Sequence, residues 1–391
     1  MHGLQAIVAF FRFELRLRFR QPAMWLFFGV FALLGFGAMA SDAVRIGGGI
    51  GQTAINAPFV IVQMLVIMSV LGVLLVTAFA AGAVVRDFDE DAYQLFYTKP
   101  IRAADYLLGR FAGGTFAAIV SLGGTAVGMA VGTLMPWVDA ERLVAFSMTP
   151  YLHTMIVFVA PNLIVMGAIF FTLATLTRRM LWAYVGVAGF FVLYALSQSY
   201  IGDLDNDMLA ALADPFGLGA LQLETRYWTA SERNTSLIGL SGVLGLNRVV
   251  WLGVGAAFLA FALKRFTLSA PTSGASKAGA PSDRASRPEM PIPVAHRSFG
   301  AAAQVRQFLF QARVELRGVV TSTAYLVLAV FSVINVYGGT YGTTNAMFGT
   351  PVYPVTSLMM GVINDSMALF MLIVITFQAG ELLWKERKVG L

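Results

Sequence analysis

Long apolar stretches, separated by shorter polar ones, dominate the hydrophobic pattern of this chain. A helix needs about 20 mostly apolar residues to cross the roughly 30 Å hydrocarbon core of a bilayer. Eight stretches meet or approach this length, so the pattern predicts an all-α, polytopic membrane protein with about eight transmembrane helices. The predicted spans are Met24–Ala40, Phe59–Val85, Tyr106–Leu134, Tyr151–Leu176, Trp182–Ile201, Leu246–Leu263, Ala324–Gly338 and Thr356–Leu383.

The first 20 residues follow a different pattern. Apolar side chains recur there at helical spacing, and three arginines form an adjoining stripe; these residues are Leu4, Ile7, Val8, Phe11 and Leu15, and Arg12, Arg16 and Arg20. This arrangement predicts an amphipathic helix that lies in the membrane interface with its arginines among the headgroups. A frayed polar tail is the alternative.

Composition and charge agree with a membrane location. The chain is 58% hydrophobic and 12% charged, against roughly 25% charged residues in soluble domains. It contains no cysteine, which excludes disulfides and thiolate metal sites. The net charge of +6 could suit nucleic acid, but 22 of the 27 Lys and Arg lie in segments that the predicted spans place on the same side of the membrane as the N-terminus. The positive-inside rule therefore predicts a multi-pass protein with a cytoplasmic N-terminus, whose partner is the lipid bilayer and not nucleic acid.

An internal repeat divides the chain into domains. "FELRLRFRQPAMWLFFGVF" from Phe13 is echoed by "VELRGVVTSTAYLVLAVF" from Val314, and "VTAFAAGAVVRDFDED" by "VITFQAGELLWKERK". Both copies run in the same direction, which argues against transporters built from inverted halves. We predict a first six-helix unit over residues 1–265, a flexible cytoplasmic linker rich in Ser, Ala, Pro and Gly over 266–303, and a partial second unit over 304–391, with an interfacial helix and two spans.

The connection between the second and third predicted spans is unusually charged. It reads "VVRDFDEDAYQLFYTKPIRAADYLLGRF" and mixes aromatic residues with the charges. Acids suit the positive N-terminal end of a helix, and a proline ends one, so we predict a short helix over residues 87–99. Such a mixture is typical of a protein interface, although a solvated turn would also explain the charge. The candidate interface residues are Asp87, Asp89, Glu90, Asp91, Tyr93, Phe96, Tyr97, Lys99, Pro100 and Arg102.

The same connection carries a family resemblance. "FYTKPIRAADYLLGRF" resembles the segment after the second span in type-2 ATP-binding-cassette (ABC) exporter permeases; the matching positions are Lys99, Pro100, Arg102, Tyr106, Leu107, Leu108, Gly109 and Arg110. "APNLIVMGAIFFTLATLTRRMLWAY" resembles the family's fourth span. "DPFGLGALQLETRYWTASERN" resembles an outer loop of bacterial proteins in which two permease units precede a zinc aminopeptidase.

The chain departs from that subgroup, and its motifs limit what it does by itself. No His-Glu-x-x-His motif occurs, since the histidines are His2, His153 and His296, so no metal site or peptidase activity is predicted. No Gly-x-x-x-x-Gly-Lys-Ser/Thr loop occurs either, so the chain is not expected to be an enzyme. Its second unit stops after two spans, so we expect further permease helices from a longer chain or a second subunit.

The resemblance implies the transmembrane permease subunit of an ABC-type exporter in the bacterial inner membrane. It also implies a cytoplasmic dimer of ABC ATPase subunits as the partner, with ATP and Mg bound there and no cofactor bound by this chain. Residues 87–99 would be the coupling helix received by a groove of that ATPase, with Phe96 and Tyr97 as its anchors and the acids setting its register. The alternative is a non-transporting membrane anchor, or the membrane portion of a larger polytopic enzyme.

Two polar residues inside predicted spans are candidates for a substrate path or a helix interface. Asn162 follows Pro161 in the fourth span, and Asp365 lies in the outer half of the last. A charge near the centre of a span costs about 2.5–3.5 kcal/mol, so Asp365 should face water or another helix. Hydrogen bonding between helices is the default role of an intramembrane Asn.

Overall fold

The computed structural model describes residues 3–41, 53–90, 101–200, 207–268 and 300–321, together with Ala92, Gln94, Phe96 and scattered positions from 325 to 364. The chain divides into two units, Met1–Leu268 and Ser269–Leu391, each described by itself below. Every regular element among the described residues is a helix, and none is a strand. The all-α prediction is therefore confirmed for this part of the chain.

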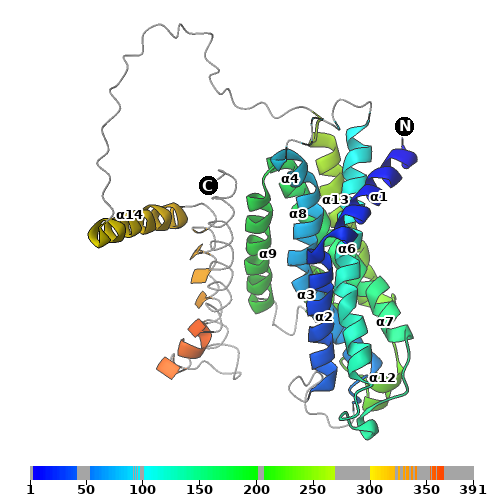
Figure 1. The fold of residues 1–391 in the computed structure, drawn as a ribbon. Helices are drawn as coiled ribbons and strands as arrows, with labels where there is room; N and C mark the ends of the chain where they lie inside the picture. Colours follow the sequence, from blue (N-terminus) through cyan, green and yellow to red (C-terminus); the bar gives the residue numbers. More distant parts are fainter. Residues whose placement is uncertain are drawn as a thin grey trace, which may run out of the picture. The chain divides into compact units, whose positions relative to one another are not determined.

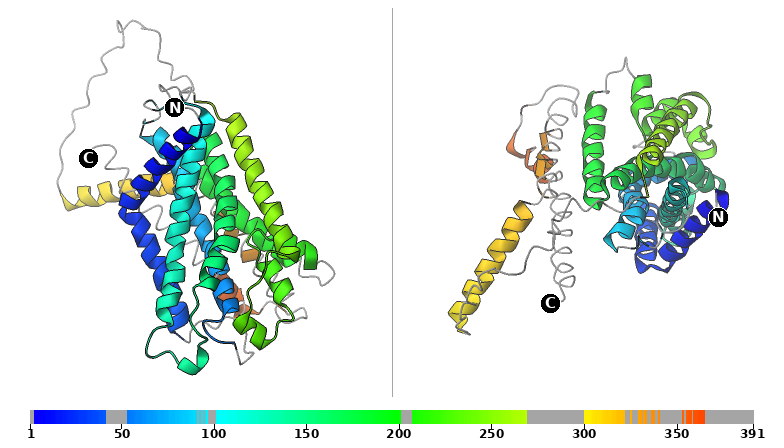
Figure 2. Two further views of the ribbon diagram at one scale, coloured as in Figure 1. Left: turned by 90° about the vertical axis from the view of Figure 1, so that its right-hand side faces the viewer. Right: turned by 90° about the horizontal axis from the view of Figure 1, so that it is seen from above.

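Five helices of the first unit are long and apolar enough to cross a membrane, and they run side by side (Figures 1 and 2). They are α2 (Pro22–Ala40); the continuous helix Pro58–Asp89, made of α3 (Pro58–Val76), the π-helical segment η1 (Thr77–Ala81) and α4 (Gly82–Asp89); α6 (Ala103–Gly132); the continuous helix Thr149–Thr177, made of α7 (Thr149–Thr154), the π-helical segment η3 (Met155–Val159) and α8 (Ala160–Thr177); and α13 (Gly242–Arg265). They coincide with five of the eight predicted spans and indicate a membrane-embedded protein.

The other three predicted spans are not established as membrane-crossing helices. Trp182–Ile201 corresponds to α9 (Met180–Tyr200), but the described apolar part of α9, Met180–Tyr194, is shorter than a full span. Ala324–Gly338 and Thr356–Leu383 lie largely outside the described residues, as does the predicted linker 266–303. The structure thus supports five long apolar helices, and the predicted number of about eight is not confirmed.

Prolines mark where several of these helices begin or change geometry. Pro22, Pro58 and Pro150 occupy the first turns of their helices, where a missing N–H costs nothing because the first-turn N–H groups have no partner within the helix. Pro161 lies two residues after the end of η3. Because proline cannot donate the regular i to i−4 hydrogen bond, a local departure from α-helical geometry is expected at this position.

Glycines let α6 approach α2 closely. A Cβ atom at Gly128 would lie 2.9 Å from the Cα of Ala32 and closer still to the Ala32 carbonyl oxygen. Gly124 and Gly132 meet the backbone of α2 in the same way, at Phe28 and Phe36. Helices in membranes associate through such small-residue contacts because lipid supplies no hydrophobic drive between them.

The predicted amphipathic helix is present as α1 (Leu4–Arg20). Arg12, Arg16 and Arg20 are exposed as predicted. The inward face of α1, however, carries the buried side chains of Glu14 and Arg18. Figure 1 shows α1 at the same end of the bundle as α4; we call this the proximal end, and the opposite end, near α7 and α12, the distal end.

Short helices connect the long ones. They are the 3₁₀ helix η2 (Ala140–Arg142), α10 (Asp207–Ala213), α11 (Leu218–Thr225) and α12 (Ala230–Thr235). The last begins with a capping box, in which the Thr229 hydroxyl accepts a hydrogen bond from the Glu232 N–H while the Glu232 carboxylate accepts one from the Thr229 N–H. Such a box stabilises the start of a helix too short to be stable alone.

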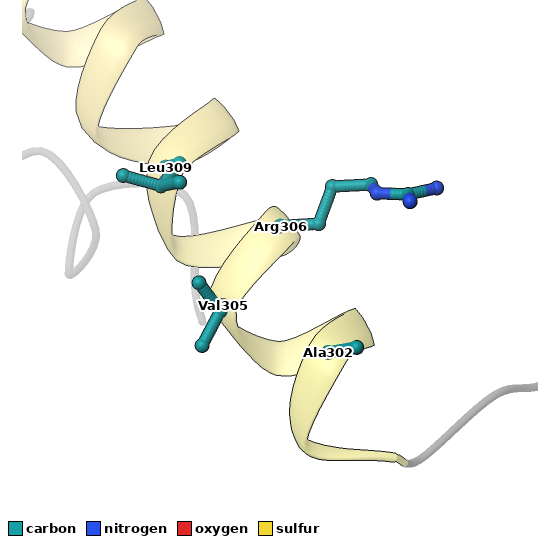
Figure 3. A pocket seen from close by; sticks show the side chains of 4 residues that line it. All are labelled: Ala302, Val305, Arg306 and Leu309. Carbon is teal, nitrogen blue, oxygen red and sulfur yellow. The ribbon is translucent and has the colours of Figure 1, made fainter.

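In the second unit, the best-described element is α14 (Ala301–Val320). A hollow on its surface is lined by Ala302, Val305, Arg306 and Leu309 (Figure 3). All four residues come from this one helix, so the hollow is an open surface feature without enclosing walls and makes a poor small-molecule site.

Candidate functional site

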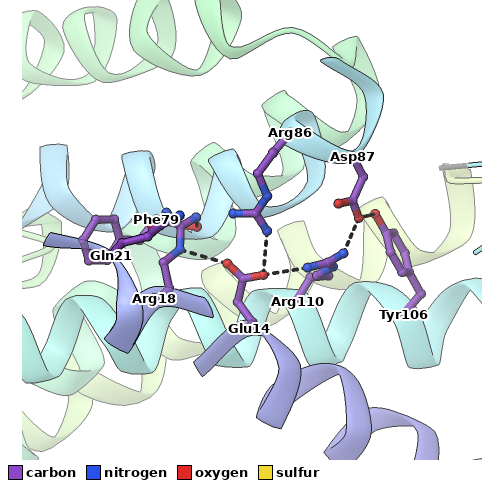
Figure 4. A network of polar contacts seen from close by, with 8 residues as sticks. All are labelled: Glu14, Arg18, Gln21, Phe79, Arg86, Asp87, Tyr106 and Arg110. Carbon is purple, nitrogen blue, oxygen red and sulfur yellow. Dashed lines mark hydrogen bonds and ion pairs between the residues drawn. The ribbon is translucent and has the colours of Figure 1, made fainter. Parts of the chain in front are cut away.

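A group of charged side chains joins three helices at the proximal end of the first unit (Figure 4). We call it the charge cluster; its members are Glu14 and Arg18 of α1, Arg86 and Asp87 of α4, and Tyr106 and Arg110 of α6. The cluster brackets the charged connection between the second and third long helices, because α4 leads into that connection and α6 follows it.

Glu14 lies at the centre of the cluster and is fully buried. Its Oε2 accepts hydrogen bonds from Arg110 Nη1 at 2.7 Å and Arg86 Nη2 at 3.0 Å, and its Oε1 accepts one from Arg18 Nε at 2.9 Å. One carboxylate thus holds three guanidinium groups from three different helices. Each contact is a charge-assisted hydrogen bond, the strongest kind available to side chains.

Arg110 extends the cluster to a second carboxylate. Its Nη2 donates to Asp87 Oδ2 at 2.5 Å, and the Tyr106 hydroxyl donates to the same oxygen at 2.7 Å. Asp87 lies in the last turn of α4, where the helix dipole disfavours a negative charge. The two donors from α6 compensate for that position and so hold the end of the second long helix against the start of the third.

Close packing of α1 on α6 brings these groups together. A Cβ atom at Gly113 would lie 2.6 Å from the Cβ of Glu14, and one at Gly109 would overlap the side chain of Phe10. Glycine at both positions is therefore required for the helices to approach this closely. The glycines of the "LLGRFAGG" stretch thus have a packing role next to the buried arginine.

Arg18 reaches from α1 to the π-helical segment of the second long helix. Its Nη2 donates to the Phe79 carbonyl oxygen at 2.8 Å, and its guanidinium lies 4.9 Å from the centre of the Phe79 ring. The wider turn of a π-helix alters the normal hydrogen-bond ladder and leaves carbonyl groups available to other donors. Arg18 supplies such a donor.

Aromatic rings cover Arg110 on its other sides. The centres of the Phe13, Phe96 and Tyr106 rings lie 4.8, 5.2 and 5.6 Å from its guanidinium carbon. Such cation–π contacts gain strength where water is excluded. Phe96 also packs edge-on against Phe10, with ring centres 5.9 Å apart.

The predicted interface residues are placed differently from one another. Asp87 and Asp89 lie in the last turn of α4 rather than in the first turn of a separate helix, so the predicted start at residue 87 is wrong. The helix continues because no breaking residue precedes them and Asp87 has partners on α6. Asp89, Glu90 and Arg102 are exposed, whereas Phe96 is partly buried against α1. Asp91, Tyr93, Tyr97, Lys99 and Pro100 lie outside the described residues, and so does Asp365.

Asn162 is fully buried and has partners on every side. Its Nδ2 donates to Ser69 Oγ at 2.8 Å and to the Phe216 carbonyl oxygen at 3.1 Å, and its Oδ1 accepts from Arg248 Nη1 at 2.6 Å. This bonding fits the default role of a residue between helices. Arg248 was not singled out from the sequence, nor was the central position of Glu14.

The charges of the cluster are engaged with one another. Three guanidinium groups face two carboxylates, which leaves one excess positive charge inside the cluster. Among the described residues, no group of three or more His, Cys, Asp or Glu side chains could hold a metal ion. The contacts of the cluster tie α1, α4 and α6 together.

The electrostatic balance at Glu14 predicts a pH dependence of stability. Burial raises the pKa of Glu14, but Arg86, Arg18 and Arg110 together lower it by more than burial raises it, so its pKa lies below the ordinary value of 4.5. The stabilisation it gives is therefore complete above about pH 4.5 and is lost as the pH falls through the lowered pKa. We expect the melting temperature of the detergent-solubilised protein to fall across this acidic range.

The Glu14→Gln variant separates this residue from the other carboxylates. It should start from a lower melting temperature and lose less of it on acidification, because its side chain at position 14 cannot be protonated. Equal acid slopes for the wild type and the variant would contradict the assignment.

The chain matches no protein-family model, and no curated protein matches it either.

Proposed function

We propose that this chain is the transmembrane permease subunit of an ABC-type exporter. One observation carries the proposal: Arg110, which occupies the Arg position of the family-like Tyr-Leu-Leu-Gly-Arg motif, is fully buried and joins Glu14 to Asp87. A force applied to the connection between α4 and α6 would pass through these contacts to three helices at once. A permease driven from that connection needs such a junction.

The proposed partner is a cytoplasmic dimer of ABC ATPase subunits, which would bind ATP and Mg. Closure of the dimer would push on residues 90–102 and switch the permease between inward- and outward-facing states. ATP can drive this switch only if the ATPase binds the connection more tightly in one state than in the other. The complex would lie in the bacterial inner membrane.

The inward position of Phe96 changes which residue should serve as the anchor. Phe96 contacts Phe10 and Arg110 within this chain, so its packing contributes to the junction itself. Tyr97 is the better candidate for contact with the ATPase, because a buried aromatic side chain in a partner's pocket typically dominates an interface.

The test is purification of the tagged chain from its native membrane and reconstitution of the complex in lipid nanodiscs. We expect an ABC-class ATPase to co-purify and to hydrolyse ATP. Tyr97→Ala should weaken association at least about tenfold. Phe96→Ala should instead lower the melting temperature of the chain and leave its affinity for the ATPase closer to that of the wild type.

The matched control is Tyr227→Ala, which removes an aromatic side chain that is 87% exposed and lies far from the connection in the sequence. Neither association nor stability should change. Purification of the intact chain without any ATPase, and without ATP hydrolysis, would instead favour a membrane anchor or the membrane portion of a larger enzyme.

A further inference from the structure

The proximal end of α13 reaches the charge cluster. This helix packs mainly against α8, and only 22% of the residues in its apolar stretch are buried. At its end, Lys264 and Arg265 are exposed, but the next residue, Phe266, is almost fully buried. The side chain of Phe266 therefore turns away from the exposed face of α13 and into the first unit.

The partner of Phe266 is Tyr106 of the charge cluster. The planes of the two rings lie within 15° of parallel, and their centres are 6.2 Å apart, an offset stacking that aromatic pairs favour. The Phe266 N–H donates to the Ala262 carbonyl oxygen at 2.9 Å, and the backbone of Phe266 is extended, with φ −78° and ψ 129°. One residue thus ends α13 and covers Tyr106.

Tyr106 is the common member of a group of four aromatic residues. Its ring also contacts Phe10 of α1 and Phe96 of the charged connection, with ring centres 5.4 and 6.2 Å away. We call Phe10, Phe96, Tyr106 and Phe266 the aromatic clamp. Four segments of the chain meet in this clamp: α1, the connection between α4 and α6, α6 itself, and the end of α13.

The polar end of Tyr106 belongs to the charge cluster. Its hydroxyl donates to Asp87 Oδ2 at 2.7 Å, and Arg110 donates to the same oxygen. Because the hydroxyl is rigidly attached to the ring, the rings that hold Tyr106 in place also fix the direction of its hydroxyl. A displacement of Phe266 is therefore passed on to Asp87, at the end of the second long helix.

Phe266 lies close to the point where the chain leaves the first unit. That unit ends at Leu268, which packs against the same apolar core as Phe266. The sequence then continues toward α14 of the second unit. The segment that joins the two units thus starts two residues after the aromatic clamp.

We infer that Phe266 is a positioning residue that couples the exit of the chain from the first unit to the charge cluster. Docking of Phe266 on Tyr106 holds the Tyr106 hydroxyl on Asp87, and withdrawal of Phe266 frees the ring and loosens this bond. Coupling of this kind is reciprocal, so loss of the hydroxyl must also weaken the docking of Phe266. The inference concerns contacts within the first unit and does not depend on an ATPase partner.

The first experiment removes the Phe266 ring and follows α4. Amide hydrogen exchange is measured for the full chain in lipid nanodiscs, as the wild type and as Phe266→Ala. In the last turn of α4, the Glu90 N–H is bonded to the Arg86 carbonyl oxygen at 3.0 Å. Exchange there should become about three- to tenfold faster, because the turn opens more easily without the aromatic contact.

Two controls separate this effect from a general loss of stability. The short helix α12 lies at the distal end (Figure 1), and its exchange should not change in Phe266→Ala. Phe261→Ala is the matched control on the same helix, because it removes a ring that is about half exposed. Exchange in α4 should be the same in Phe261→Ala and in the wild type.

The second experiment tests reciprocity with Phe266 in place. The chain has no cysteine, so Leu268→Cys supplies a single thiol whose reaction rate with a water-soluble maleimide reports undocking of this segment. Tyr106→Phe keeps the ring and removes only the hydroxyl, and it should raise the rate about threefold or more. Tyr151→Phe is the matched control and should leave the rate unchanged, because the buried Tyr151 hydroxyl has no hydrogen-bond partner among the described residues.

Three results would overturn the inference. Unchanged exchange in α4 of a folded Phe266→Ala protein would show that Phe266 does not position Asp87. Equal acceleration in α4 and α12 would leave Phe266 with a general packing role only. An unchanged rate for Leu268→Cys in the Tyr106→Phe background would show that the hydroxyl and the stacked rings are independent. If Phe266→Ala fails to fold, Phe266→Leu replaces it, because leucine keeps an apolar side chain without a ring.

Discussion

Glu14→Gln is expected to be the most destabilising single substitution in the charge cluster, at about 3–5 kcal/mol. Glutamine has nearly the same shape as glutamate, so the loss of stability comes from the missing negative charge. The wild-type cluster holds three guanidinium groups and two carboxylates. Without Glu14, three positive charges face only Asp87 in a buried site. The measurement is reversible unfolding in detergent, or the melting temperature where unfolding is irreversible.

A second substitution should partly rescue the first. Arg86 is the most exposed of the three arginine partners, with 19% of its side chain accessible, so its loss creates the smallest defect. The double variant Glu14→Gln with Arg86→Gln restores a single excess positive charge. It should be more stable than Glu14→Gln alone, because the effects of substitutions at contacting residues are coupled and do not simply add. Arg12→Gln, at an exposed position of α1, serves as the control and should be nearly neutral. Additive losses in the double variant would argue against charge balance as the cause.

Gly128→Ala should disrupt the contact between α2 and α6. The new methyl group would overlap the Ala32 carbonyl oxygen, and backbone atoms cannot move aside as the end of a flexible side chain can. Overpacking of this kind costs about 1–3 kcal/mol or more. We expect a clear fall in melting temperature and a larger fraction of misfolded protein after expression.

Gly29→Ala on α2 is the matched control for this substitution. A Cβ atom at Gly29 would meet nothing within 4 Å, so the same chemical change in a packed partner helix should leave stability nearly unchanged. Comparable losses at positions 29 and 128 would show that helix flexibility, rather than the contact with Ala32, explains the effect.

Hydropathy and periodicity predicted α1 and five long helices because burial in lipid selects apolar side chains over a whole helix length. The charge cluster could not be read in the same way, since its members are separated by up to 96 positions. One local feature of the sequence did indicate a buried charge in α1. Glu14 falls at helical spacing from Ile7 and Phe11, on the face of α1 that turns inward, and a charge on an apolar stripe indicates a buried partner.

The turn between α10 and α11 gave no such signal. Its turn residues, Asp214 to Gly217, are typical of an exposed loop, and only the donors on α8 and α13 make a buried position possible. Asn162 and Arg248 come from segments 86 positions apart, so their pairing depends on the packing of complete helices. The predicted role of Asn162 between helices was accessible from its place inside a span, but its partners were not.

The π-helical segment η1 has a consequence for how the second long helix presents its side chains. A π-helical turn contains an extra residue relative to an α-helical one, and each residue of an α-helix advances the side chain by about 100°. Residues after Ala81 therefore lie about a quarter turn from where an uninterrupted helix beginning at Pro58 would place them. An uninterrupted α-helix of the same residues would turn Arg86 and Asp87 away from Glu14 and Arg110, whereas deleting one residue within Thr77–Ala81 would restore regular α-helical geometry and leave their direction nearly unchanged. The insertion thus sets the rotational phase in which the membrane part of this helix meets its charged end.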